Sequence, residues 1–346
     1  MYKVKVNDFL LYDDNASALP LVDPMLCLAV NEVSSFEFTI YPEHPYYFNI
    51  ETMFCDIRVY QNDLLVFRGR PISIVYGDFY EKKVKCEGNL AFLFDTLQDP
   101  YDIYNKPSDI LKLLINKHNQ QTPITEPVDV NLPRHYRIGN IRLDNDSSIA
   151  ITDSDYEVIF DVIYDKLIKK VGGYLYVRYD SDENAYIDYV SGFLNVSPQK
   201  IMFGKNLTGF KRTISGSGYF NCILPFGQDG LTIESVNAGN KYLENTTEIE
   251  NRGKFTKMME WGHITRADSL KTRAQEYLDD AIRLRDTYEI TAVNIGDEPF
   301  IIGESVKVES PPHKINGHFA ITKLVVNLLN PASNKMTLVL ETTIGA

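Results

Sequence analysis

LLVFRGRPISIVYGDFYEKKVKCEGNLAFLFD, residues 64–95, is the stretch that decides the fold. Its pattern predicts a strand from Leu64 to Arg68, followed by two strands, Arg70 to Tyr76 and Lys82 to Glu87. The last two pair around Gly77-Asp78-Phe79-Tyr80, because Gly and Asp favour a tight turn between apolar runs. Short strands at this spacing are typical of a small antiparallel barrel.

The composition favours strands over helices in a globular chain. The 346 residues are 44% hydrophobic and 24% charged, with 22 Tyr and 18 Phe against one Trp. This length predicts two to four domains, each with its own core. Aromatic residues are enriched in strands, so we expect more sheet than helix.

The charge argues against a protein that binds nucleic acid through its phosphates. The chain has 35 Lys and Arg against 47 Asp and Glu, a net charge of -12. Binding phosphates needs clustered positive charge, whereas like charges repel within a Debye length of roughly 10 Å. The charge therefore fits either an ordinary acidic surface or a surface that nucleic acid passes without adhering.

The cysteines and the first residues bear on where the protein is made. The four cysteines form no CxxC pair, and such usage suits a reducing compartment. We expect no signal peptide, because the residues after Met1 alternate like an edge strand. We also expect no membrane span, since no apolar run approaches roughly 20 residues.

The hydrophobic pattern divides the chain into four parts, which together predict a mostly β, α+β fold with two related antiparallel barrels. Residues 1–99 form the first barrel domain, completed by strands from residues 199–227. Residues 100–198 form an inserted α+β module. A loop and helix-containing region covers residues 228–288, and residues 289–346 form the second barrel domain.

Local signals place the helices within these parts. Ser108 is the predicted N-cap of one helix. Ser154 to Glu157 fit a capping box for a second, which Gly172-Gly173 ends. An exposed amphipathic helix starts at Thr265, after a polar stretch from Asn237 to Asn251 that we expect to be a surface loop.

A second hairpin resembles the first and suggests an internal repeat. Strands from Phe319 to Leu329 and from Lys335 to Thr342 flank a turn containing Pro331. In this alignment Ile321-Thr322 takes the place of Ile72-Ser73, and a strand ending in Glu341 takes the place of the strand ending in Glu87. The repeat predicts two related barrels in one chain.

The sequence shows no pattern of residues typical of catalysis, cofactor binding or metal binding, and we predict no site of any of these kinds. The six histidines occur without an HExxH motif or a cysteine pair. Two acidic runs, Asp144 to Ser148 and Asp180 to Asn184, lack the glycine and glutamate of a calcium loop, so turn and helix-cap chemistry explains them better. Ser215-Gly216-Ser217-Gly218 matches neither a nucleophile elbow nor a phosphate loop. The histidines are His44, His118, His135, His263, His313 and His318.

Arg68 and Arg70 flank Gly69 at the entrance to the first hairpin. One interpretation places one of them in an ion pair between subunits, and the other leaves both solvated on one strand face. We slightly prefer the first.

Several stretches together resemble one family, the tail-hub proteins of bacteriophages, and above all the N-terminal hub part of the tail-associated lysin or prophage tail endopeptidase. The matching stretches follow the same order over nearly the whole chain. They are Glu32 to Ile40, Val66 to Arg70, Asp78 to Tyr80, Cys86 to Leu93, Asn116 to Asn119, Lys166 to Ile168, Gly172 to Leu175, Phe203 to Leu207, Leu224 to Gly227, Ser310 to His313 and Leu329 to Pro331.

The resemblance implies a structural hub at the virion tail tip, similar to the hubs of contractile-tail baseplates. In that family two related barrels per subunit make a homotrimeric ring with pseudo-sixfold symmetry. The implied partners are the distal tail protein, the tail tube or tape-measure protein, and receptor-binding or spike proteins. DNA would pass through the channel without specific binding.

The C-terminus differs from the longer members of this family, which carry a wall-degrading region after the hub. This chain ends at Ala346, directly after the last predicted strand, and we therefore predict no enzymatic activity. Two alternatives come from other classes: a peptidoglycan-degrading hydrolase, and a carbohydrate-binding tail-tip module favoured by the 22 tyrosines.

Overall fold

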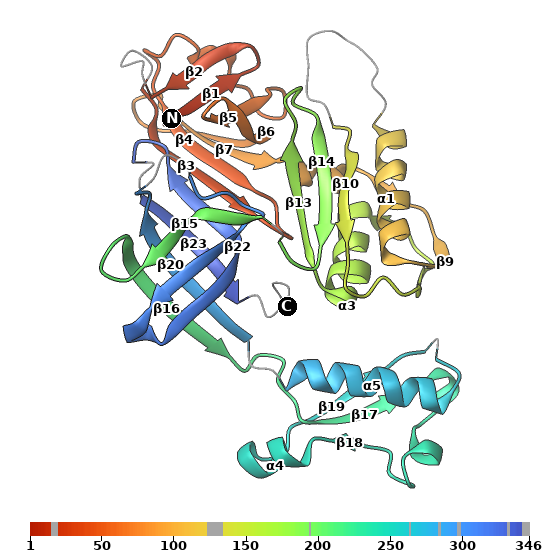
Figure 1. Ribbon diagram of the computed structural model, residues 1–346. Coiled ribbons are helices and arrows are strands. Elements are labelled where there is room, and N and C mark those ends of the chain that lie inside the picture. Colours follow the sequence, from red (N-terminus) through yellow and green to blue (C-terminus); the bar gives the residue numbers. More distant parts are fainter. Residues whose placement is uncertain are drawn as a thin grey trace. The chain divides into compact units, whose positions relative to one another are not determined.

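The computed structural model describes residues 1–14, 20–122, 134–193, 195–262, 264–282, 285–295, 299–330 and 333–340 (Figure 1). It is 45% strand and 22% helix, which confirms the predicted mostly β class. The chain divides into two compact units, which are described separately. Unit 1 consists of Met1–Lys211 and Tyr288–Ala346, and unit 2 consists of Arg212–Thr287.

Unit 1 is built around one curled sheet of 13 strands (Figure 1). Its N-terminal strand group consists of β1 (Tyr2–Val6), β2 (Phe9–Asp13), β3 (Val22–Ala29), β4 (Ser35–Ile40), β5 (Ile57–Gln61), β6 (Leu64–Tyr76) and β7 (Lys82–Gly88). Its C-terminal strand group consists of β15 (Val196–Met202), β16 (Leu207–Ser215), β20 (Arg285–Val293), β21 (Ser305–Ser310), β22 (Ile315–Asn327) and β23 (Ser333–Leu340). The predicted strands of residues 64–95 are β6 and β7, with the first two predicted strands fused into one.

The two strand groups join where β3 pairs antiparallel with β22, so one sheet runs through both. The predicted completion of the first barrel by residues 199–227 is wrong. β15 pairs with β21 and β16 pairs with β20, so these strands belong to the C-terminal group. The later part of that stretch, β17 (Cys222–Phe226), belongs to a separate sheet in unit 2.

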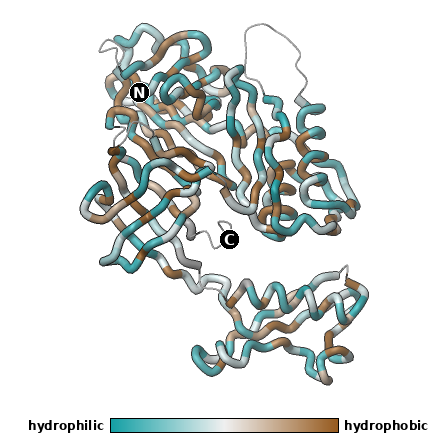
Figure 2. Tube along the Cα trace, in the orientation of Figure 1, coloured by the Kyte–Doolittle hydropathy of each residue, from teal (hydrophilic) through white to brown (hydrophobic). Residues whose placement is uncertain are grey.

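One hydrophobic core lies under the curled sheet and draws on both strand groups. Alternate residues of β1 are completely or almost completely buried, and so are Phe36, Phe38 and Ile40 of β4. This period of two is what a half-buried strand requires. Val306, Val308 and Leu324 extend the same core into the C-terminal group. Hydrophobic residues accordingly follow the strands of the sheet in Figure 2.

Between β7 and β15 lies an α+β module with its own core (Figure 1). Its elements are η2 (Asn89–Asp95), β8 (Leu97–Gln98), β9 (Tyr101–Asn105), α1 (Pro107–Gln121), β10 (Arg137–Arg142), β11 (Ile149–Asp153), β12 (Glu157–Val158), α2 (Ile159–Val162), the π-helical segment Ile163–Ile168, α3 (Lys169–Val171), β13 (Tyr174–Tyr179) and β14 (Ala185–Val190). Its three-stranded sheet has the order β10-β14-β13.

Both helix starts predicted in this module are wrong. Pro107 is the first residue of α1, so Ser108 lies inside the helix, and Asp146 instead accepts hydrogen bonds from the Ser108 backbone nitrogen (2.9 Å) and hydroxyl (2.7 Å). Glu157 belongs to the short strand β12, which pairs with β8, and the second helix begins at Ile159. The predicted end of that helix at Gly172 agrees with the structure, where Gly172 has a φ of 82°.

Unit 2 consists of a three-stranded sheet, β18-β17-β19, and helices packed around it. Its remaining elements are the 3-10 helices η4 (Gln228–Gly230) and η5 (Glu234–Val236), β18 (Leu243–Glu244), α4 (Thr246–Arg252), β19 (Thr256–Glu260) and α5 (Ala267–Ala281). The stretch from Asn237 to Asn251 is therefore not one long loop. α5 is amphipathic, as predicted, and its buried face contains Leu270, Ala274 and Leu278.

Candidate assembly interface

The order of strands in the large sheet repeats between the two strand groups. In the N-terminal group the order is β3-β4-β7-β6-β5-β1, and in the C-terminal group it is β16-β20-β23-β22-β21-β15. Strands that occupy equivalent places in the two groups also follow one another in the same order along the chain. β2 is an additional strand of the N-terminal group. One difference is direction: β1 runs antiparallel to β5, whereas β15 runs parallel to β21.

The two long hairpins, β6-β7 and β22-β23, also share a β-bulge. In β6 the register shifts between Pro71 and Ser73, and in β22 it shifts between Ile321 and Lys323. Ile72 and Thr322 are therefore the extra residues, and the repeat is offset by one residue from the alignment expected from the sequence. The inward positions correspond as well: Lys82, Val84 and Cys86 in β7 and Asn334, Met336 and Leu338 in β23 are all buried. The part of the comparison that used Glu341 lies outside the described residues.

The repeat leaves one open edge in each group. Residues 323–327 of β22 pair with β3, and the Thr322 carbonyl accepts from the Val30 backbone nitrogen (3.0 Å). The counterpart in β6 is residues 73–76, but β5 pairs only with residues 64–69 and the Met53 backbone nitrogen bonds to Pro71 (2.7 Å). Among the described strands, nothing pairs with residues 73–76 on that edge. β16, the counterpart of β3, has β20 as its only neighbour among them.

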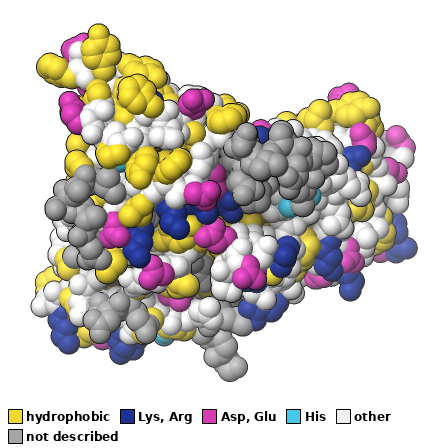
Figure 3. All heavy atoms as spheres, turned by 90° about the horizontal axis from the view of Figure 1, so that it is seen from above, with side chains coloured by type: hydrophobic (Ala, Val, Ile, Leu, Met, Phe, Trp, Pro, Cys, Tyr) yellow, Lys and Arg dark blue, Asp and Glu magenta, His cyan; other side chains and the backbone are white. Residues whose placement is uncertain are grey.

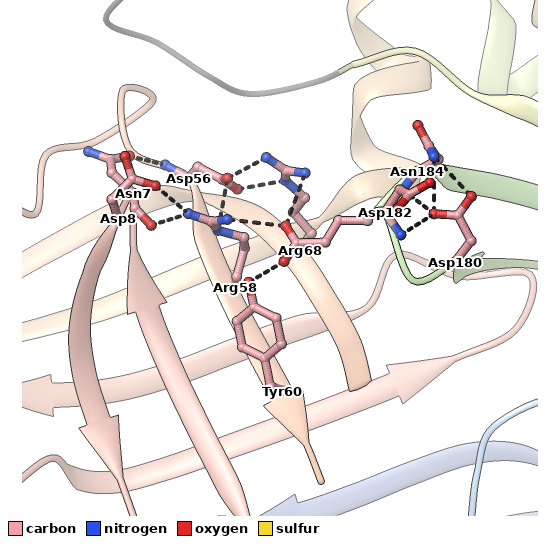
Figure 4. Close-up of polar contacts among 10 residues, drawn as sticks. Asn7, Asp8, Asp56, Arg58, Tyr60, Arg68, Asp180, Asp182 and Asn184 are labelled. Atoms are coloured by element: carbon pink, nitrogen blue, oxygen red, sulfur yellow. Dashed lines mark hydrogen bonds and ion pairs between the residues drawn. The ribbon is translucent and has the colours of Figure 1, made fainter. Parts of the chain in front are cut away.

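Arg68 lies in a buried ion-pair network rather than on an exposed face (Figure 4). Its guanidinium donates two hydrogen bonds to Asp56, of 3.0 and 2.6 Å, and both residues are buried. The Arg58 Nε atom lies 3.3 Å from the same carboxylate. Such a pair is costly to break, because the remaining charge would be buried without compensation.

Glu183 connects this network to the α+β module. It stands in the β13-β14 turn with a φ of 61°, and its carboxylate accepts from Arg58 (3.1 Å) and from the Tyr60 hydroxyl (2.6 Å). Burial opposes ionisation, but these hydrogen bonds outweigh it and hold the pKa of Glu183 below its usual value. Burial and the bond to Glu183 raise the pKa of Tyr60. The turn is thus fixed to β5 by charge-assisted hydrogen bonds.

Arg70 also forms ion pairs within its own chain. It donates to Glu87 (2.7 Å) and twice to Asp95 (2.6 and 2.9 Å). The interpretation of Arg68 and Arg70 as two solvated side chains is therefore wrong, because both are buried and paired within their own chain. An ion pair between subunits stays a prediction. A hollow of about 370 Å³ beside Arg70 is lined by Ile72, Glu87 and Phe94 among others. Two carboxylates already neutralise this guanidinium, and the other cationic side chain that lines the hollow, Lys85, lies 3.4 Å from Glu37.

The histidines serve local structure where the structure describes them. His118 is fully buried between the Thr96 hydroxyl (2.8 Å) and the Arg134 carbonyl (2.8 Å), and burial lowers its pKa. His44 lies 2.9 Å from the Leu11 carbonyl, and His313 lies 2.7 Å from the Ser310 hydroxyl. Across the described residues no three His, Cys, Asp or Glu side chains are placed to share a metal ion. His263 lies outside the described residues.

The acidic run Asp180 to Asn184 and the Ser-Gly stretch form turns, and the acidic run Asp144 to Ser148 holds a helix start. Asp180 accepts from the backbone nitrogens of Asp182 and Asn184, both at 2.9 Å (Figure 4). Asp146 in the other run holds the start of α1. Gly218 has a φ of 80°, and the Tyr219 nitrogen bonds to the Gly216 carbonyl (3.0 Å). These contacts explain the residue types without a ligand.

Two features of this surface were not predicted from the sequence. One is the network of Asp56, Arg58 and Glu183, for which the only signal was an acidic turn at Asp180 to Asn184. The other is a set of exposed aromatic residues at the β6-β7 turn. Phe79 and Tyr80 are 77% and 74% exposed. Two adjacent aromatic residues in a turn of Gly and Asp are the signal that could have found it.

The fold is that of solved prophage tail proteins. The 43 kDa tail protein of prophage MuSo2 from Shewanella oneidensis has a TM-score of 0.63 at 13% identity, over 98% of this chain and 97% of that one. A tail protein from Neisseria meningitidis MC58 gives 0.62 at 13%, over 98% and 96%. The prophage tail protein gp18 from Listeria monocytogenes EGD-e gives 0.58 at 13%, over 99% and 95%.

The family model of the prophage endopeptidase tail matches residues 197–343. This match and the shared fold confirm the resemblance to prophage tail proteins that the sequence predicts. No curated protein sequence matches the chain at a significant level. In the described part of the chain, no helix is both long enough and apolar enough to cross a membrane.

Proposed function

We propose that this protein is a structural component of a phage or prophage tail, located at the tail tip, and that three copies form a ring. The observation that carries the proposal is the repeated strand order with one open edge in each group. Within the chain, β3 pairs with residues 323–327 of β22. The equivalent pairing joins β16 of one copy to residues 73–76 of β6 in the next.

This pairing is head to tail, because the two edges belong to different parts of the chain. Head-to-tail contacts generate a closed ring or an open helix, according to the rotation between neighbours. An exposed strand edge can pair with strands of other chains and so promote aggregation. Ring closure would cover both edges and remove this risk. The resemblance to tail hubs supports closure with three copies, which place six strand groups around one axis.

The ring would join the tail tube to the apparatus at its tip. The partners in this proposal are the distal tail protein, the tail tube or tape-measure protein, and receptor-binding or spike proteins. DNA would pass through the central channel without specific binding. The net charge of -12 supports such passage, since a negative protein repels the phosphate backbone.

Light scattering of the purified protein tests the ring directly. The expected mass is three times the 39.6 kDa of one chain. Electron microscopy should then show a central hole surrounded by six similar densities. A monomer at every concentration into the high micromolar range would contradict the proposal.

The proposed role is not enzymatic. None of the contacts described above favours a peptidoglycan hydrolase or a carbohydrate-binding module over a structural subunit. Release of soluble fragments from purified peptidoglycan by the wild-type protein would contradict this part of the proposal. Binding in a glycan screen would support the carbohydrate-binding alternative instead.

A further inference from the structure

A group of exposed apolar side chains lies at the end of the β6-β7 hairpin, and we call it the end patch. Figure 3 shows hydrophobic side chains gathered toward one corner of the face seen from above, on the side of the N-terminal strand group. Soluble proteins rarely expose so many large apolar groups together unless the surface has a partner. The end patch consists of Phe48 (79% exposed), Met53 (48%), Phe54 (48%), Val75 (57%), Tyr76 (61%), Phe79 (77%) and Tyr80 (74%).

The end patch is held in place by a buried frame beneath it. The buried Lys82 side chain donates to the Tyr47 carbonyl (2.8 Å) and the Ile50 carbonyl (3.0 Å). Its ammonium lies 4.3 Å from the centre of the Tyr47 ring and 5.9 Å from that of Tyr76. The Tyr47 hydroxyl in turn donates to the Tyr80 carbonyl. The aromatic rings are therefore presented by a rigid support and lose little freedom on binding.

The equivalent end of the C-terminal hairpin is partly covered by the same chain, while Leu329 stays 54% exposed. Leu328 follows β22 and is fully buried, and its backbone nitrogen bonds to the Pro24 carbonyl (2.9 Å). The Tyr12 hydroxyl lies 3.5 Å from the Leu328 carbonyl oxygen. Pro24 directly precedes the residues of β3 that pair with β22. The first residues of β3, before the part that pairs with β22, thus contact the end of the hairpin.

The segment before β16 has the same place in the C-terminal group, and it carries an exposed aromatic residue. Phe203 is 53% exposed and stands in a turn next to Gly204, whose φ is 76°. The buried Asn206 fixes that turn by accepting from the Met202 nitrogen (2.8 Å) and donating to the Lys200 carbonyl (2.9 Å). A rigid aromatic projection therefore precedes one open edge, and a rigid aromatic surface borders the other.

We propose that the end patch is the docking surface for residues 203–206 of a second copy of this chain, with Phe203 against the rings of Tyr76 and Tyr80. The proposal rests on the ring proposed above and assigns the contact that fixes its register. Strand pairing alone is tolerant of slippage along an edge. An aromatic anchor at the end of the paired segment allows one register only.

Photo-cross-linking tests the contact in the full chain. With Tyr76→p-benzoylphenylalanine, we expect a cross-link to residues 199–207 of another copy, identified as intermolecular by mixing isotope-labelled and unlabelled protein. The control is Tyr104→p-benzoylphenylalanine, since Tyr104 is also highly exposed, at 76% against 61% for Tyr76, but lies in the α+β module. Cross-links from position 76 only to other segments, or to a different protein added to the mixture, would overturn the proposal.

A substitution at the other side of the contact gives an independent readout. Phe203→Ala should raise the concentration at which half of the protein is trimeric by roughly tenfold, the effect typical of an aromatic anchor. Phe255→Ala is the matched control, because Phe255 is 48% exposed and lies in unit 2. A wild-type trimer that Phe203→Ala leaves unchanged would refute the end-patch contact and leave the ring standing. A wild-type monomer would refute the ring itself.

Discussion

Ile72 and Thr322 occupy equivalent places in two hairpins, each as the extra residue of a β-bulge. The register of β6 shifts at Ile72 and that of β22 shifts at Thr322. A bulge bends its strand and increases the local twist. In β22 the bulge separates the segment that pairs with β21 from the segment that pairs with β3. In β6 it likewise separates the part covered by β5 and Met53 from the open edge.

The open edge of β16 leads to a first prediction, which uses a proline. β16 has β20 as its only neighbour among the described strands, and Lys211 lies in the middle of β16. Lys211→Pro should keep the fold, because prolines are tolerated on edge strands, and should abolish the trimer. Size-exclusion chromatography with light scattering measures this.

The control for that variant is Lys211→Ala. It removes the same 2.7 Å ion pair with Glu289 but keeps the backbone donor. It should therefore remain trimeric. A folded Lys211→Pro protein that is still trimeric would show that β16 does not form the subunit contact.

Gly69 carries the second prediction, which concerns stability. A Cβ atom at this position would lie 2.0 Å from the Glu87 carbonyl oxygen, so Gly69→Ala must displace the backbone of β7. We expect it to lower the free energy of unfolding by about 1–3 kcal/mol, the usual cost of overpacking. Urea unfolding followed by far-ultraviolet circular dichroism measures the change. Gly262→Ala meets no atom within 4 Å and should cost little; an equal effect of both would contradict the steric explanation.

The local features of the fold follow from the sequence, and the long-range ones do not. Alternation in residues 64–95 predicts strands because only neighbours along the chain decide it. The hairpin repeat is visible for the same reason. The partners of β15 and β16 cannot be predicted in this way, since their pairing with β21 and β20 depends on residues about 80 to 110 positions away. The sequence shows that residues 199–215 form strands but not which group they join.

The helix caps and the ion pairs also depend on residues that are distant in the sequence. The start of α1 is held by Asp146, which lies 38 residues from Ser108, so a local capping rule selects the wrong residue. Arg68 is charged and lies beside a glycine, which suggests exposure. Its burial follows from Asp56, which reaches it only because β5 and β6 pair. A charged side chain can be placed inside only when its partner is known.

Arg68 provides the third prediction. Arg68→Met should lower the free energy of unfolding by roughly 3–5 kcal/mol, because the buried Asp56 loses its two-pronged partner. The matched control is Arg266→Met, which removes a 2.6 Å pair with Asp268 on the surface, where Arg266 is 74% exposed. Surface pairs contribute little, so its effect should stay below about 1 kcal/mol.

The single tryptophan allows the Arg68 effect to be localised. Trp261 belongs to unit 2, whereas Arg68 belongs to unit 1. Arg68→Met should shift the unfolding curve measured by circular dichroism and leave the tryptophan fluorescence transition in place. An equal shift of both transitions would show that the two units unfold together.

Glu183 yields the last prediction, on pH. Its pKa in the folded protein lies below the ordinary value of 4.5, held there by the bonds from Tyr60 and Arg58 against the effect of burial. A carboxyl whose pKa is lowered on folding stabilises the protein fully above its unfolded pKa, and this stabilisation is lost as the pH falls through the folded pKa. Melting temperatures measured from neutral pH downward should therefore fall below about pH 4.5 more steeply for the wild type than for Glu183→Gln. Glu276→Gln, which changes a side chain that is 58% exposed, should keep the wild-type slope. If Glu183→Gln also keeps the wild-type slope, the hydrogen bonds between the β13-β14 turn and β5 do not contribute to acid sensitivity.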